Sequence, residues 1–103
     1  MSQFDNVSVV KKGNVFFDGK CVSHSVLFAD GTRKTVGVIM PGTLTFNVST
    51  PELMEITSGT CRVKIGDEPE FKTYAEGDQF AVAANSRFVI ETSEVVNYVC
   101  SFG

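Results

Sequence analysis

Two cations and a hydroxyl stand together at Arg33-Lys34-Thr35, just before a segment that contains Gly37. Arginine binds phosphate oxygens through two parallel N–H bonds, and lysine adds a second positive charge, so this triplet could hold an inorganic anion. A charged strand end in solvent explains the triplet equally well. Arg87, beside Ser86, is a second candidate, but alternation places it opposite Phe88 and favours a surface charge.

The stretch from Thr43 to Gly59 carries polar groups of a different kind. Thr45 and Asn47 share one face of a predicted strand, and Glu52 begins the next strand. Asparagine can both donate and accept hydrogen bonds, and a buried carboxylate without a partner is costly. These groups could bind a hydroxylated ligand. They could also form a satisfied polar network in which Glu52 pairs with an arginine.

The chain has one histidine, His24, in the middle of an alternating segment. A threonine, an asparagine and one carboxylate make a poor site for a transition metal, which prefers imidazole, thiolate or several carboxylates. We therefore expect no metal site. His24 is interpreted as a half-buried structural residue, although an imidazole in a pocket can also act as a general acid.

Composition limits the class of protein. At 103 residues the chain is long enough for one domain with one core. Its net charge is −3 and it has no basic run, so nucleic-acid binding is not expected.

The three cysteines match no disulfide framework and are interpreted as buried free thiols in a reducing compartment. The N-terminus lacks an apolar signal core and no apolar run could span a membrane, which predicts a cytoplasmic protein with no membrane contact.

No segment has a helical period over two turns. About ten short strands with frequent turns predict an all-β sandwich or barrel. Lys20–Phe28 and Thr60–Ile65 alternate clearly, and Gly37 within Lys34–Met40 suggests a bulge or the close approach of a bulky group. Residues 1–13 are predicted to form an N-terminal arm, with a possible strand at Val7–Val10, ahead of a main domain over residues 14–103.

The spacing of the central stretch resembles the first motif of the cupin family. In that motif a His-x-His pair is followed by four residues, a Glu, six residues and a Gly. Here Thr45 and Asn47 stand at the two histidine positions, Glu52 and Gly59 keep theirs, and Phe88 stands where the second motif ends in a histidine. The resemblance implies a single cupin-type jelly-roll barrel from which the metal-binding histidines have been replaced.

Further motifs resemble the small one-domain cupins known as pyrimidine/purine nucleoside phosphorylases. The resemblance covers Asn14 to Phe102. The chain departs from the family in an N-terminus longer than that of minimal members and at Val82-Ala83-Ala84, where many members have Val-Pro. The order and spacing of the following pieces carry it: Phe17-x-Gly19-Lys20, Gly37-Val38-Ile39-Met40-Pro41-Gly42, Thr45-Phe46, Pro51-Glu52-x-Met54, Ser58-Gly59, Ala75-x-Gly77, Phe80-x-Val82, Asn85-Ser86-x-Phe88 and Tyr98-x-Cys100.

This resemblance implies phosphorolysis of purine and pyrimidine ribonucleosides to free base and α-D-ribose 1-phosphate. It also implies a homodimer, for which Val7–Val10 could provide an edge strand. The transition state is cation-like at the anomeric carbon. Phosphorolysis needs no metal in principle, so we expect no cofactor, with nucleosides and inorganic phosphate as the two substrates.

Roles can then be assigned as expectations. Glu52 would hold the ribose and act in catalysis with Asn47, which would also meet the base. Arg33, Lys34 and Thr35 would bind phosphate, while Thr45 and Tyr98 would line the cavity. Phe88, or alternatively Phe80, would stack on the base, because every base has a π-face. The alternatives are a non-catalytic cupin that binds a sugar or nucleotide, and a metal-dependent cupin such as an isomerase or dioxygenase.

Overall fold

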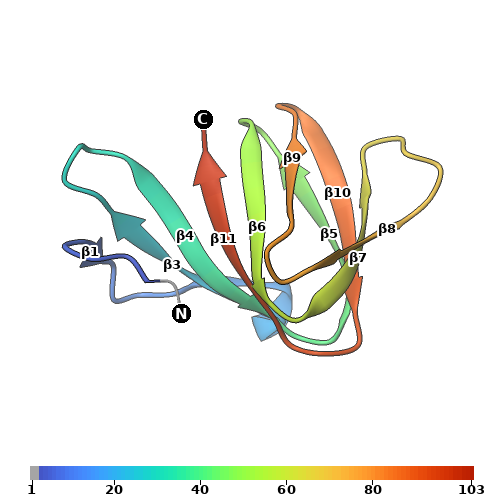
Figure 1. Cartoon of the computed structure of the whole chain (residues 1–103), viewed down its shortest axis with the longest axis horizontal. Coiled ribbons are helices and arrows are strands. Elements are labelled where there is room, and N and C mark those ends of the chain that lie inside the picture. The colour runs from blue at the N-terminus through green and yellow to red at the C-terminus, as the bar shows by residue number, and fades with distance from the viewer. Residues whose placement is uncertain (1–2) are drawn as a thin grey trace.

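The computed structural model describes residues 3–103, which form two antiparallel sheets (Figure 1). The larger, seven-stranded sheet has the order β1-β3-β4-β11-β6-β9, and β2 also pairs with β3. Its strands are β1 (Ser8–Val9), β2 (Asn14–Phe16), β3 (Cys21–Leu27), β4 (Arg33–Ile39), β6 (Glu52–Ser58), β9 (Gln79–Val82) and β11 (Val96–Phe102).

The smaller, four-stranded sheet has the order β5-β10-β7-β8. Its strands are β5 (Gly42–Val48), β7 (Thr60–Ile65), β8 (Lys72–Ala75) and β10 (Ser86–Thr92), and a single 3-10 turn, η1 (Phe17–Gly19), follows β2. In Figure 1 the strands β3, β4, β11 and β6 stand side by side from left to centre, with β5, β10 and β7 at the right. This is the predicted all-β, jelly-roll arrangement.

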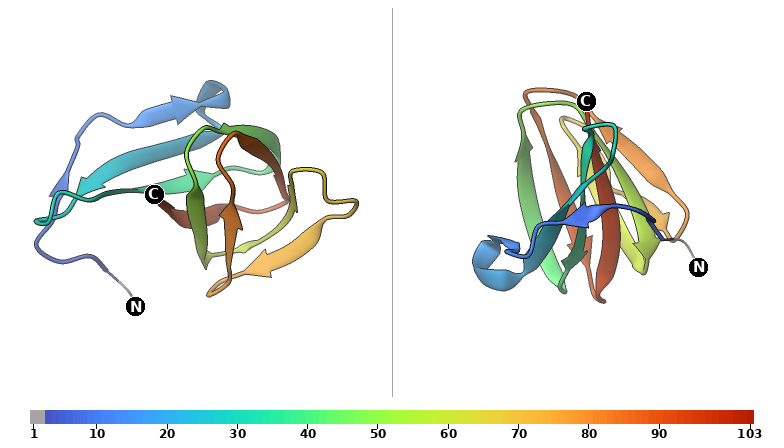
Figure 2. Two further views of the ribbon diagram at one scale, coloured as in Figure 1. Left: turned by 90° about the horizontal axis from the view of Figure 1, so that it is seen from above. Right: turned by 90° about the vertical axis from the view of Figure 1, so that its left-hand side faces the viewer.

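The barrel is not closed, because the two sheets form separate hydrogen-bonded ladders. Figure 2 shows β3 and the N-terminal segment extending beyond the four-stranded sheet. The gap on this side is bridged by side chains: Phe16 and Phe17, at the end of β2 and in η1, contact Phe46 of β5 edge to face, with ring centroids 6.5 and 5.1 Å apart. These rings border the side on which the two ladders do not join, and we call this side the barrel mouth.

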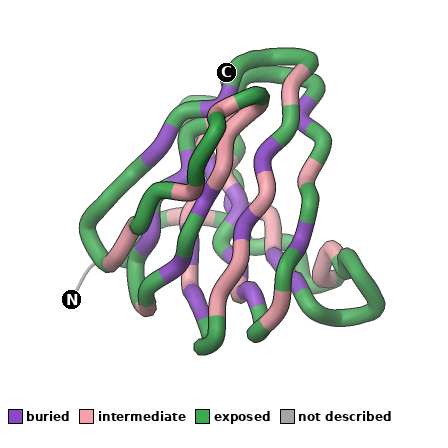
Figure 3. Tube along the Cα trace, turned by 90° about the vertical axis from the view of Figure 1, so that its right-hand side faces the viewer, coloured by how far each residue is buried: buried purple, intermediate pink, exposed green. Residues whose placement is uncertain are grey.

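Period-two alternation decides which side chains form the core. Figure 3 shows buried and exposed segments alternating along the strands. In β6 the inward residues Met54 and Ile56 are buried, whereas Leu53 and Glu55, which alternate with them, are exposed. The buried cluster joins both sheets through β-branched residues, rings and the three cysteines, which are buried free thiols as predicted.

Gly37 is the point where the backbone of β4 lets a large side chain lie against it. It pairs with Tyr98 of β11 in the ladder. A Cβ on Gly37 would lie 2.7 Å from the Tyr98 ring, closer than carbon atoms can approach. The predicted close approach of a bulky group is therefore confirmed, and it fixes the place of the Tyr98 phenol.

The N-terminal arm is attached to the edge of the large sheet. The predicted Val7–Val10 strand is the short β1, which pairs with β3 of its own chain. His24 on the outer face of β3 donates from Nδ1 to the carbonyl oxygen of Val10, at 3.1 Å. The histidine thus has the structural role that was predicted. Over residues 3–103, no helix has the length and apolar character needed to cross a membrane.

We predict that Gly37→Ala lowers the free energy of unfolding by about 1–3 kcal/mol, because the new methyl group forces the Tyr98 ring to move. Urea denaturation followed by tyrosine fluorescence measures the loss. The matched control makes the same change in a Tyr98→Leu background, where a smaller side chain leaves room. An equal loss in both backgrounds would contradict the proposed contact.

Candidate active site

A cavity of about 290 Å³ lies between residues of the two sheets, at the end of the molecule where β11 ends. Arg33 begins β4, Glu52 begins β6 and Phe102 ends β11, so antiparallel pairing brings all three to this end. The walls combine polar groups with rings and sulfur atoms: Asn14, Phe16, Ser23, Arg33, Thr35, Phe46, Asn47, Glu52, Met54, Phe88, Tyr98, Cys100 and Phe102.

The cavity collects six of the eight residues singled out from the sequence. They are Arg33, Thr35, Asn47, Glu52, Phe88 and Tyr98, and they come from five strands in the two sheets. The sequence distance between them is large, and the ladders of β4, β11 and β6 bring most of them together. A volume near 300 Å³ is at the small end of ligand-binding pockets and suits a ligand of nucleoside size.

Lys34 does not enter the cavity. Arg33 and Thr35 occupy the inward positions of β4, so Lys34 points to the outer face, where its ammonium lies 5.6 and 5.7 Å from the ring centroids of Phe4 and Phe28. The prediction that Lys34 shares an anion site with Arg33 is wrong, because neighbours on a strand face opposite sides.

Thr45 is also outside the cavity, whereas Asn47 is one of the residues that line it. Both are exposed, while Leu44 and Val48 are buried and Phe46 packs on the core. The inward face of β5 is therefore the apolar one, and the expectation that Thr45 lines the cavity is wrong, whereas Asn47 lines it from an exposed position. The alternation Leu44-Phe46-Val48 was the sequence signal that could have given the correct face.

Glu52 is the carboxylate of the cavity. It is half-buried, and the thiol of Cys100 donates to its Oε1 at 3.4 Å. Burial raises the pKa of the Glu52 carboxyl, and the hydrogen bond from Cys100 opposes part of that rise. Among residues 3–103, Glu52 forms no salt bridge, so the alternative of a structural ion pair with an arginine does not hold.

Arg33 provides the cation of the same cavity. Its guanidinium lies over the Phe102 ring, 4.4 Å from the centroid, and donates weakly to Ser25 Oγ at 3.4 Å. Stacking on a ring orients the guanidinium plane and leaves its remaining N–H groups available to an anion. Arg87, the second cation considered, is instead a surface residue that pairs with Asp67 at 3.3 Å.

Aromatic rings form the wall opposite Glu52 and Arg33. Phe46 and Phe88 are stacked, with centroids 5.1 Å apart and planes 15° from parallel, and Phe80 meets Phe88 edge to face at 5.5 Å. Phe88 is only 1% exposed, whereas Phe16 at the mouth is 45% exposed. The rings that a ligand can reach are therefore Phe46 and Phe16, which the sequence did not single out.

Phe16 is held at the mouth by an unusual turn. Phe17 and Asp18, which follow it, have φ values of 53° and 55°, in the left-handed region that bulky side chains rarely adopt. Such strain persists only where surrounding contacts impose it, here the edge-to-face contact of Phe17 with Phe46. The turn thereby joins β2 to β5 across the open side of the barrel.

Tyr98 adds a hydrogen-bonding group to the cavity. Its hydroxyl lies 3.4 Å from Cys21 Sγ, and the Ser23 hydroxyl in the same cavity accepts from Asn14 Nδ2 at 3.3 Å. Burial raises the pKa of the Tyr98 phenol above its usual range, so it remains neutral. The group can therefore donate as well as accept at neutral pH.

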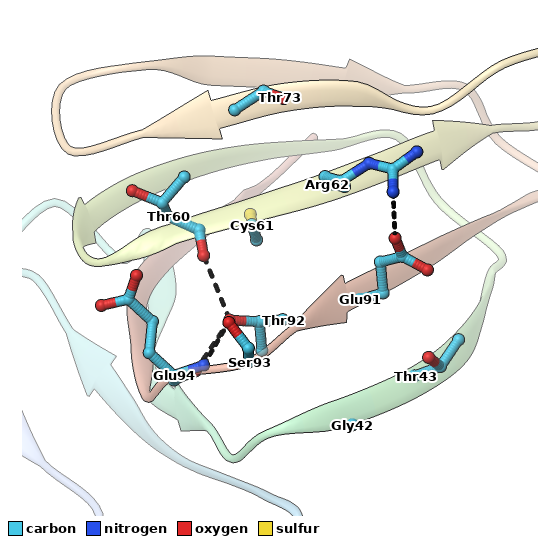
Figure 4. Close-up of a pocket in the computed structure, with 10 residues that line it drawn as sticks. All are labelled: Gly42, Thr43, Thr60, Cys61, Arg62, Thr73, Glu91, Thr92, Ser93 and Glu94. Atoms are coloured by element: carbon cyan, nitrogen blue, oxygen red, sulfur yellow. Dashed lines mark hydrogen bonds and ion pairs between the residues drawn. The ribbon is translucent and has the colours of Figure 1, made fainter.

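A second and larger depression, of about 490 Å³, lies at the opposite end of the four-stranded sheet (Figure 4). Its charged groups already bind each other, since Arg62 pairs with Glu91 at 2.8 Å at the surface. The Thr92 hydroxyl donates to the carbonyl oxygen of Glu94 at 2.8 Å and lies 3.1 Å from that of Thr60. With its polar groups satisfied in this way, this depression is a weaker candidate than the barrel mouth.

Metal ligands are not gathered in either depression. Over the described part of the chain, no three His, Cys, Asp or Glu side chains are close enough together to hold an ion. The side chains of the barrel mouth instead suit an organic ligand with hydroxyl groups, an aromatic ring and a negative charge. Glu52 can accept from the hydroxyls, and Arg33 can bind the charge.

The fold and the ring-lined mouth define a small cupin-type protein. The structure is similar to an ectoine synthase from P. lautus, with a TM-score of 0.68 and 17% identity, over 82% of this chain and 64% of that chain. At this identity the likeness concerns the fold alone.

Residues 11–102 match the family described as pyrimidine/purine nucleoside phosphorylase, and the chain belongs to that family. A pyrimidine/purine nucleoside phosphorylase of Cupriavidus metallidurans is 64% identical over 103 residues, which cover the whole of both chains. A crystal structure of a protein of unknown function from Acinetobacter sp. ADP1 superposes with a TM-score of 0.96 at 54% identity, over 98% of each chain.

We predict that Glu52→Gln stabilises the protein at pH 7.5 and that this gain disappears as the pH falls to 4. Burial raises the pKa of Glu52 in the folded state, so folding favours the protonated carboxyl. The resulting penalty is present only above the pKa of the unfolded chain, about 4.3 for glutamate, and glutamine removes it. Urea denaturation at the two pH values measures the difference.

The matched control is Glu55→Gln, on the exposed face of the same strand, which should change stability little at either pH. A Glu52→Gln variant less stable than the wild type at pH 7.5 would contradict the unpaired, half-buried state of this carboxylate.

Proposed function

We propose that this chain is a metal-independent nucleoside phosphorylase, which cleaves purine and pyrimidine ribonucleosides with inorganic phosphate to free base and α-D-ribose 1-phosphate. The family of the chain supports the reaction class. The observation that carries the site assignment is that Arg33 and Glu52 line one ring-walled cavity without pairing with each other.

Glu52 would bind the ribose in the ground state and stabilise the transition state. As the bond to the base breaks, positive charge develops at the anomeric carbon, and a carboxylate in a half-buried site stabilises that charge more strongly than one in water. Its Oε1 is occupied by the Cys100 thiol, so Oε2 is the oxygen available to the sugar hydroxyls.

Arg33 would bind phosphate at the mouth. A guanidinium can hold two phosphate oxygens in parallel, which positions a third oxygen for attack on the anomeric carbon. Its stacking on Phe102 supports this role because it limits the orientations of the guanidinium. Thr35, two residues along the same face and buried, would assist through its hydroxyl.

The base would stack on Phe46 and Phe16, and the amide of Asn47 would meet its polar edge at the rim. Stacking tolerates purines and pyrimidines alike, because it depends on the π-face and not on a hydrogen-bond pattern. An amide both donates and accepts, so it can stabilise the negative charge that develops on different departing bases. Phe88, buried behind Phe46, would support the stacking ring.

We also propose that the protein acts in the cytoplasm as a homodimer. Its three buried free thiols suit a reducing compartment. The outer side of the sheet edge at β1 and β2 carries the exposed apolar residues Val9 and Val15, and pairing with a second copy would cover them. Light scattering on the purified chain tests this, and a monomer at micromolar concentration would exclude the dimer.

We expect the purified protein to release uracil from uridine and adenine from adenosine only when phosphate is present. Chromatography of the base together with a ribose 1-phosphate assay measures the reaction. Glu52→Gln should lower kcat by roughly two to three orders of magnitude, because charge stabilisation in the transition state is lost.

Arginine variants complete the experiment. Arg33→Met should raise the KM for phosphate, while Arg87→Met, at a surface pair, should leave it unchanged. Nucleoside binding without any base release would favour the alternative of a non-catalytic binding protein. Full activity in Glu52→Gln would remove this carboxylate from the site.

A further inference from the structure

We propose that Cys100 is a positioning residue: its thiol holds Oε1 of Glu52 by a hydrogen bond, keeps the carboxylate ionised and directs Oε2 toward the ligand. The inference deepens the proposed function and rests on it for the role of Glu52 in binding ribose. The hydrogen bond itself and its effect on the carboxylate can be tested without that role.

A row of side chains across three neighbouring strands supports the proposal. Thr35 of β4 lies directly opposite Cys100 of β11, and Glu52 of β6 lies opposite Phe102, two residues further along the same face of β11. The three side chains therefore all project into the cavity. The Cys100 thiol donates to Glu52 Oε1 at 3.4 Å, whereas its other acceptor, the carbonyl oxygen of Ser101, is 4.0 Å away.

The chemistry of this thiol suits a permanent donor. Cys100 is 4% exposed, and burial together with the negative charge of Glu52 raises its pKa to about 12. The thiol therefore keeps its proton throughout the physiological range and can donate to Glu52 at every pH at which an enzyme works. Thr35, directly opposite Cys100 in the ladder, completes the row.

The Cys100 thiol is the main group in the cavity that stabilises the negative charge of Glu52. Arg33 on β4 is the only formal cation that lines the described cavity, and it is not within salt-bridge distance of Glu52. On β11 the titratable groups facing the cavity are Cys100 and Tyr98, and on β9 the partner opposite Glu52 is the apolar Val82. Rings from β5 and β10 cover the far side.

The alternative is that Cys100 is a buried residue with a packing role only. Both interpretations predict that truncation lowers stability, so stability does not separate them. They differ in the midpoint of the Glu52 titration. A loss of packing volume alone would leave this midpoint unchanged, whereas the loss of a hydrogen-bond donor would move it to higher pH.

The experiment follows the Glu52 carboxyl carbon by NMR in ¹³C-glutamate-labelled protein, with the signal identified by its absence in Glu52→Gln. Cys100→Ala and Cys100→Val both remove the donor, and valine also fills the space. Both should move the midpoint of the Glu52 titration upward by about one pH unit, since a hydrogen bond to a charged group is lost. Cys100→Ser, which keeps a donor, should leave the midpoint in place or lower it.

Cys61→Ala is the matched control, since Cys61 is an equally buried thiol in the other sheet and lies outside this cavity. It should lower stability without moving the Glu52 midpoint. Unchanged midpoints in folded Cys100→Ala and Cys100→Val, or a serine variant that behaves like alanine, would overturn the proposal. Should alanine fail to fold, the valine and serine variants decide the outcome.

The acid limb of kcat/KM against pH provides the second readout, and it should move upward with the NMR midpoint in the alanine and valine variants. Two failures can then be told apart. If the wild-type protein releases no base but the midpoints move as expected, the proposed function is wrong and the thiol–carboxylate bond stands. If base is released and the midpoints do not move, the role of Cys100 is wrong.

Discussion

An unpaired carboxylate inside a ring-lined cavity is the feature on which the functional account depends. Glu52 is half-buried, no salt bridge neutralises it within residues 3–103, and Phe16, Phe46, Phe88, Tyr98 and Phe102 contribute aromatic rings to the walls of its cavity. Keeping a charge in such a place costs free energy, which the rest of the fold must supply. A site of this kind is commonly functional, because the same low polarity that destabilises the free carboxylate strengthens its attraction for a developing positive charge.

The fold supplies this environment by simple means. Antiparallel pairing of β4, β11 and β6 sets Thr35, Cys100 and Glu52 across one face, and Gly37 leaves room for the Tyr98 ring in the same layer. The open side of the barrel, where the two ladders do not join, is bordered by Phe16, Phe17 and Phe46. We propose that a ligand reaches Glu52 from this side, because Phe16 and Phe46 also line the cavity that contains Glu52.

Much of this arrangement could be predicted from the sequence. Short alternating segments gave the all-β class, and the spacing around Glu52 gave the inward direction of that carboxylate. The errors came from the faces of two strands. Lys34 was grouped with Arg33 although neighbours on a strand point to opposite sides. Thr45 was placed at the cavity because the spacing of a motif was preferred to the apolar alternation of Leu44, Phe46 and Val48. Hydrophobicity decides the buried face more reliably than polar residues at motif positions.

Other parts of the site could not have been predicted in this way. The bond between Cys100 and Glu52 joins residues 48 positions apart and depends on the register of β11 against β6. The position of Phe16 depends on left-handed backbone at Phe17 and Asp18, a conformation that no residue preference favours for phenylalanine. Both are properties of the assembled sheets and not of any local segment.

The most direct test of the central claim is a crystal structure of the wild-type chain with ribose 1-phosphate. The account predicts the sugar in the cavity between the sheets, with a ribose hydroxyl bonded to the Glu52 carboxylate and the phosphate oxygens on Arg33. A sugar phosphate bound at the Arg62 and Glu91 groove, with an empty barrel mouth, would contradict it.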